Sequence, residues 1–153
     1  MASPIDASII LCDAAQSDSV GKLHMLGAGW STTTSPTAPQ AVAVLIKVPW
    51  DRANQPLTLK LQLLDADGHP ALLPSPLGQT PILVESTLEV GRPPGIPAGS
   101  PIGASFALNV QPMPLPPGRY EWHLDIADEP FSAFFLVREG PERGASPSAP
   151  TGG

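Results

Sequence analysis

The sequence has few charged residues and particularly few basic ones. Only 14% of its 153 residues are charged, and 14 acidic residues against eight Lys and Arg give a net charge of −6. The basic residues are scattered along the chain, whereas phosphate binding requires clustered Lys and Arg. We therefore expect no nucleic-acid partner, and the same sparse positive charge argues against a polybasic membrane anchor.

Cysteine is almost absent, since Cys12 is the only one. A single cysteine cannot form an intrachain disulfide, which favours a reducing compartment. Long apolar runs are also lacking near the start, where Ile9-Ile10-Leu11-Cys12 is too short for a signal or transmembrane helix and follows no basic segment. These features predict a cytoplasmic protein without a membrane partner.

Proline and glycine, in contrast, are abundant, with 21 and 14 residues respectively. They lie between short apolar runs and so indicate many turns. The length is sufficient for one hydrophobic core. From about Glu139 onward the sequence has little to bury, so we predict a single domain over residues 1–138 and a disordered tail over residues 139–153.

The clearest structural pattern is at residues 115–126. Pro116-Pro117-Gly118 predicts a turn, because proline fixes φ and glycine tolerates positive φ. The next residues alternate, with Tyr120, Trp122, Leu124 and Ile126 on one face and charged or polar residues on the other. Such alternation is typical of a half-buried strand. A tyrosine directly after a turn also resembles the tyrosine corner of immunoglobulin-like sandwiches, so we expect the Tyr120 hydroxyl to bond the backbone of the preceding loop.

Similar short runs separated by turns predict an all-β protein, specifically an antiparallel immunoglobulin-like β-sandwich of about eight or nine strands. The segments 32–40, 74–81 and 91–101 are predicted loops. One helical turn is expected over residues 49–54, capped by Asp51. The predicted strands are residues 7–14, 22–30, 41–48, 57–63, 71–73, 82–90, 102–110, 119–126 and 131–137.

We expect no metal site and no cofactor. The histidines, His24, His69 and His123, are interpreted as surface residues. Asp65-Ala66-Asp67-Gly68 begins like a calcium loop but lacks an acidic residue at the twelfth position, so a hairpin turn is the favoured interpretation.

No catalytic residue stands out either. Cys12 precedes Asp13 but lies in an apolar run, which favours packing as a small hydrophobe. Glu85 and Glu89 share a strand face at a separation too large for a retaining carboxylate pair. Gly27-Ala28-Gly29 lacks the third glycine and the helix of a phosphate loop.

Two predicted strands, the first and the last, are apolar on both faces and need cover from a loop, from the tail or from another molecule. The residues that this pattern marks as interface candidates are Phe131, Phe134, Leu136, Ile10 and Cys12. We therefore expect a non-catalytic binding or assembly module that engages a protein partner or forms a homo-oligomer. The alternative is an enzyme whose site the sequence does not reveal.

Several segments together resemble a family of small uncharacterised bacterial proteins, found mainly in actinobacteria. The resemblance spans residues 5–138 and implies a single free-standing domain, without assigning an activity, a ligand or a site residue. The segments that carry it are Leu11-Cys-Asp-Ala-Ala-Gln16, Gly21-Lys-Leu-His-Met-Leu-Gly-Ala-Gly-Trp30, Val48-Pro-Trp-Asp51, Gly91-Arg-Pro-Pro-Gly95 and Leu115-Pro-Pro-Gly-Arg-Tyr120.

Overall fold

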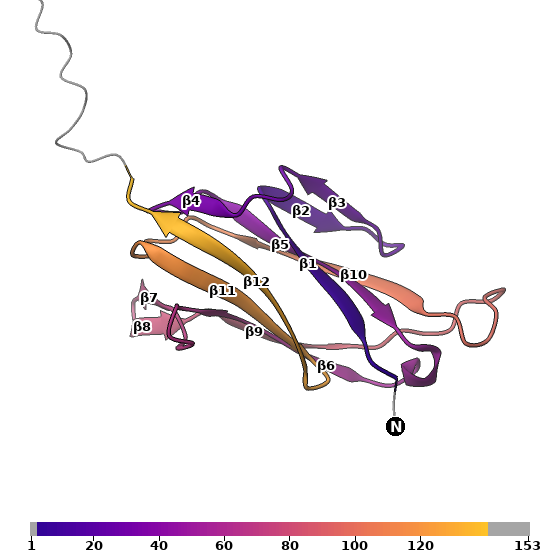
Figure 1. The fold of residues 1–153 in the computed structure, drawn as a ribbon. Coiled ribbons are helices and arrows are strands. Elements are labelled where there is room, and N and C mark those ends of the chain that lie inside the picture. The colour runs from indigo at the N-terminus through magenta and orange to yellow at the C-terminus, as the bar shows by residue number, and fades with distance from the viewer. Residues whose placement is uncertain (1–2, 141–153) are drawn as a thin grey trace, which may run out of the picture.

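The computed structural model describes residues 3–140, which form an all-β fold, as predicted (Figure 1). The strands are β1 (Asp6–Cys12), β2 (Ala14–Ser17), β3 (Leu23–Leu26), β4 (Thr32–Thr34), β5 (Gln40–Val48), β6 (Leu57–Leu64), β7 (Leu72–Ser75), β8 (Gly78–Pro81), β9 (Leu83–Leu88), β10 (Ile102–Val110), β11 (Gly118–Ile126) and β12 (Glu129–Arg138). The order β1-β5-β10 makes one antiparallel sheet, and β4-β12-β11-β6-β9 makes the other. The pairs β2-β3 and β7-β8 form two separate hairpins.

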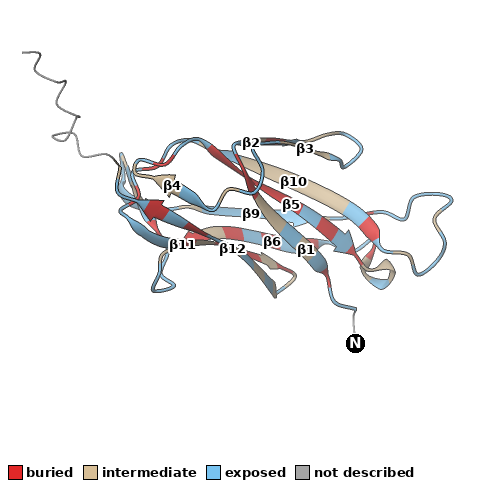
Figure 2. Ribbon diagram, turned by 45° about the horizontal axis from the view of Figure 1, so that its top comes forward, coloured by how far each residue is buried: buried red, intermediate tan, exposed pale blue. Residues whose placement is uncertain are grey.

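The hydrophobic core lies between the two main sheets, where buried segments face one another (Figure 2). On β11, Trp122, Leu124 and Ile126 are fully buried, and the intervening residues are only partly so. On β6, the leucines at 57, 59, 61 and 63 point inward in the same way. The predicted buried face of β11 is therefore confirmed, and the predicted strand over residues 57–63 buries alternate residues in the same way.

The β2-β3 hairpin covers the outer face of the three-stranded sheet. It encloses a second, smaller cluster of buried residues: Cys12, Ala15, Ala41 and Ala43. The side chain of Asn109 on β10 fastens this hairpin, because its Nδ2 donates to Ala15 O (2.8 Å) and its Oδ1 accepts from Ala15 N (3.2 Å). The hairpin thus explains why β1 and β5 can be apolar on both faces.

The first predicted strand is divided in the structure. Its backbone breaks at Asp13, after which β2 begins at Ala14, whereas the sequence predicted one strand over residues 7–14. The second predicted strand ends at Leu26, because Gly27 has φ of +62° and a Cβ there would collide with the Asp13 side chain. The break at Asp13 lets β2 run back over the sheet, where Ala15 bonds the Asn109 side chain and Ser17 bonds Ser105.

Two predicted loops contain strands. β4 pairs in parallel with the end of β12, and β8 pairs with β7. Both are three or four residues long with little apolar content, so their pairing depends on a partner strand rather than on their own alternation.

The predicted helical turn is present as a 3-10 helix, Trp50–Arg52. Its predicted cap is wrong, because Pro49 occupies the N-cap position and no side chain caps the turn. Asp51 instead accepts a hydrogen bond from Ser3 N, which fastens the start of the chain.

Tyr120 is buried and anchors the β11 turn. Its hydroxyl donates to Pro116 O (2.7 Å), and its ring stacks on Phe135 with centroids 5.7 Å apart. Burial raises the pKa of the Tyr120 phenol, and the Asp65 carboxylate raises it further, so the hydroxyl remains a donor at neutral pH. The predicted bond between this hydroxyl and the preceding loop is confirmed.

We expect Tyr120→Phe to lower the free energy of unfolding by about 1 kcal/mol, because the ring contacts stay while one hydrogen bond is lost. Urea unfolding measures this difference. A variant as stable as the wild type would show that the hydroxyl does not anchor the turn.

The predicted tail falls largely on residues 141–153, which lie outside the described residues. Within the described range, the last strand ends at Arg138. No helix among residues 3–140 is long and apolar enough to cross a membrane.

Candidate functional site

Three of the five interface candidates pack within the chain. Cys12 is fully buried, and Ile10 packs against the cluster beneath the β2-β3 hairpin. Phe131 packs against the main core. The candidate surface therefore reduces to Phe134 and Leu136.

Phe134 and Leu136 lie on the outer face of the five-stranded sheet, because alternate residues of β12 point in opposite directions. Their exposed fractions are 46% and 49%, whereas Phe135 between them is buried in the core. The guanidinium of Arg119, on neighbouring β11, lies 4.2 Å from the centre of the Phe134 ring. We call Arg119, Phe134 and Leu136 the β12 face.

The β12 face borders two shallow hollows. One is lined by the β12 face together with Ser31 and Phe135. The other continues toward the turn at residues 65–68 and is bounded by Glu121. The apolar side chains are therefore flanked by acidic groups, an arrangement typical of an interface with a polar rim.

His123 lies farther along the outer face of β11, between two carboxylates. Its Nδ1 is 2.8 Å from Glu121 Oε2, and its Nε2 is 3.4 Å from Asp125 Oδ1. Ser132 is directly opposite on β12. Because both imidazole nitrogens face carboxylates, neither is directed at Ser132 as the base of a serine nucleophile would be.

The carboxylate and imidazole groups of Asp65, Asp67 and His69 come close together at the turn after β6. One ligand atom from each lies within 4.8 Å of the others. Asp65 Oδ1 accepts from the backbone N–H groups of Asp67 (2.9 Å) and His69 (3.0 Å), and Gly68 N donates to Asp65 O. These bonds build the predicted hairpin turn and account for the position of Asp65.

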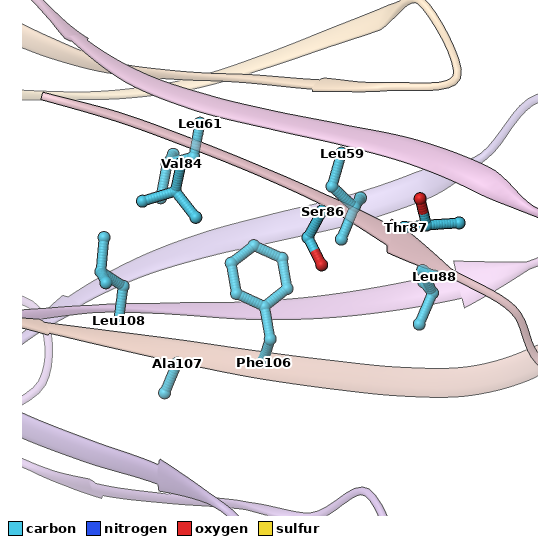
Figure 3. Close-up of a pocket in the computed structure, with 9 residues that line it drawn as sticks. All are labelled: Leu59, Leu61, Val84, Ser86, Thr87, Leu88, Phe106, Ala107 and Leu108. Atoms are coloured by element: carbon cyan, nitrogen blue, oxygen red, sulfur yellow. The ribbon is translucent and has the colours of Figure 1, made fainter.

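A separate apolar groove of about 250 Å³ lies between the edge strands β9 and β10 (Figure 3). Side chains from β6, β9 and β10 converge on it, and the Phe106 ring rises from β10 toward β9. Its lining residues are Leu59, Leu61, Val84, Ser86, Thr87, Leu88, Phe106, Ala107 and Leu108. The only polar side chains in this lining are two hydroxyls.

A family model described as "Family of unknown function (DUF6941)" matches residues 7–137. The chain belongs to this family. No curated protein matches the sequence. The expected membership of an uncharacterised family is thus confirmed for DUF6941, and the bacterial distribution stays a prediction.

For this member of DUF6941, sequence reasoning missed two features of the surface. It considered Asp65 and Asp67 apart from His69, although the i, i+2, i+4 spacing at a turn could have indicated their proximity. It also missed the groove, although Val84 and Phe106 lie within the predicted strands 82–90 and 102–110. No local pattern could have revealed the groove, which exists where one sheet ends before the other.

Proposed function

We propose that this chain is a non-catalytic binding or assembly module that engages a protein partner through the β12 face. The observation that carries the proposal is the pair of half-exposed side chains, Phe134 and Leu136, on a strand whose other face is in the core. Full burial of such a side chain is favourable by roughly 1.5–3 kcal/mol. Covering the exposed half of each side chain would therefore contribute roughly 1 kcal/mol to the free energy of binding.

The electrostatics of the β12 face favour a protein partner. Arg119 covers one side of the Phe134 ring and supplies a planar donor, and Arg and aromatic residues are enriched in protein interfaces. Glu121 lies on the neighbouring strand, directly opposite Phe134. Symmetric pairing with a second copy is the simplest outcome for such a self-contained patch.

The chemistry of the hollows also supports a binding role. The groove between β9 and β10 has an apolar lining that contains no titratable side chain. The one nucleophilic thiol, Cys12, is buried, and burial together with the Asp13 charge raises its pKa. A nucleophile needs the opposite shift.

We also propose the immunoglobulin-like form of the sandwich. The hydroxyl of Tyr120 binds the backbone before β11, and Trp122 follows two residues later, where antibody domains have a disulfide cysteine. A cytoplasmic location is likewise proposed, from the single cysteine and the absence of an extended apolar run in the sequence.

The double variant Phe134→Ser with Leu136→Ser is expected to weaken association by roughly tenfold or more, because each serine removes apolar area that a partner would bury. Analytical ultracentrifugation measures self-association, and affinity capture from the native host measures other partners. Leu45→Ser is the matched control, because Leu45 is 43% exposed on the three-stranded sheet.

The informative result is a dimer, or one captured protein, that persists in the control and is lost in the double variant. Thermal unfolding checks that all variants are folded. A monomeric wild type that captures the same proteins as the double variant would contradict the proposal.

A further inference from the structure

The two main sheets end unevenly on one side of the molecule. Beyond β10 the three-stranded sheet has no further strand among the described residues, whereas the five-stranded sheet continues to β9, which lies below β10 in Figure 1. The inner face of β9 is consequently uncovered, and Val84 is 39% exposed although its pairing partner on β6, Leu61, is buried. The groove in Figure 3 is this uncovered space.

The pairing register between β9 and β6 establishes which side chains of β9 face the groove, because directly paired residues lie on the same face of a sheet. The inward leucines of β6 pair with Val84, Ser86 and Leu88, so these three share the inner face. On the β9 side of the groove, an occupant would therefore contact two apolar side chains and one hydroxyl group.

The opposite side of the groove is formed by β10, which presents backbone N–H and C=O groups as well as side chains. β10 spans nine residues and pairs with β5 along one edge. Along its other edge, within the described part of the chain, no strand pairs with the backbone of β10. An unpaired strand edge is satisfied best by another extended polypeptide.

From this we infer that an extended segment of a partner polypeptide pairs with the free edge of β10 as a fourth strand of the three-stranded sheet. Alternate apolar side chains of that segment would pack against Val84, Leu88 and Phe106 and close the open side of the sandwich. This second site does not depend on the β12 face.

Charge further specifies the partner segment. The sequence of β10 has no charged residue, and the only charges in or directly after β9 are those of Glu85 and Glu89. Neither edge strand contains a basic residue, and the chain as a whole has a net charge of −6. Charge complementarity therefore favours a segment with Lys or Arg flanking its apolar residues over an acidic one.

The probe for this inference is a phage-displayed library of random 12-residue peptides, selected on the whole protein. We expect enriched sequences that alternate apolar residues and carry basic flanks. Ser86→Arg should weaken binding of the best synthetic peptide at least about tenfold, because a guanidinium would enter the groove. Thr58→Arg is the matched control, since Thr58 is exposed on the outer face of the neighbouring strand β6 and does not line the groove.

Backbone pairing is tested on the same peptide by methylating its amide nitrogens at alternate positions. Peptides methylated at one set of alternate positions should bind at least about tenfold more weakly, whereas peptides methylated at the other set should bind normally. The reason is that only one set of amide N–H groups points toward β10. An apolar ligand held by side chains alone would show no such alternation, and that result would overturn the inference.

Three other outcomes would also overturn the inference. These are a selection without enrichment, peptide binding that survives Ser86→Arg, and binding that is lost in Phe134→Ser with Leu136→Ser. A dimer that Ser86→Arg dissociates would assign the groove to a second copy of the chain instead. None of these outcomes by itself contradicts the β12 proposal, because Phe134 and Leu136 lie on another strand and another face.

Discussion

Trp122→Ala is expected to lower the free energy of unfolding by about 3–5 kcal/mol, the largest effect of any single change considered for this chain. Trp122 is fully buried at the centre of the core, on a strand paired with both β6 and β12. Alanine would leave a large cavity between two sheets that cannot collapse without breaking their pairing. Urea unfolding followed by circular dichroism measures the loss.

Trp122→Phe is the informative control, because it keeps most of the ring volume and removes the indole donor. Trp122 Nε1 donates to Gln40 Oε1 (3.2 Å), and Gln40 is itself buried with no hydrogen-bond partner for its Nε2 among the described residues. We expect a loss of about 1–3 kcal/mol, since a buried acceptor is left without its donor. If Trp122→Ala were no worse than Trp122→Phe, packing would not be the main contribution of this residue.

Asn109→Ala is expected to raise the rate at which Cys12 reacts with a thiol reagent by about ten- to thirtyfold. Asn109 makes two hydrogen bonds to the Ala15 backbone, each with a net contribution of about 1 kcal/mol. Without them the β2-β3 hairpin should open more often and expose Cys12, which is fully buried beneath it. Absorbance of released thionitrobenzoate follows the reaction.

The control for this prediction is Thr87→Ala, which alters an exposed side chain on β9 in the other main sheet. It should leave the labelling rate unchanged. An Asn109→Ala protein that reacts at the wild-type rate would show that other contacts hold the hairpin, such as the hydroxyl pair Ser17–Ser105 at 2.8 Å. A rate that follows global unfolding would show that the hairpin does not open separately.

Strands with strong alternation were predictable residue by residue. In β11 and β6 every second residue is apolar and long, so the buried face could be assigned before any partner was known. The turn before β11 was equally local, because its conformation follows from Pro116, Pro117 and Gly118. The Tyr120 hydroxyl bond follows from this turn, since its acceptor is only four residues away.

Weakly patterned strands were not predictable in this way. β4 consists of three threonines, and it is a strand only because the end of β12 lies beside it. β8 has the sequence Gly-Gln-Thr-Pro and depends in the same way on β7. β4 forms hydrogen bonds with a strand far away in the sequence, and β8 forms them with the preceding strand of its hairpin. The side-chain periodicity of a short strand carries no information about such partners.

The sequence by itself determined that this protein is all-β, which faces of its strongest strands are buried, and where its main turns lie. Only the tertiary structure decided which outward apolar residues are covered. Cys12 and Phe134 both lie on strands with apolar residues on both faces, yet the β2-β3 hairpin buries Cys12 whereas Phe134 remains half-exposed. The physical reason is that alternation depends on neighbours along one strand, whereas cover and the open groove depend on where separate sheets and hairpins end in space.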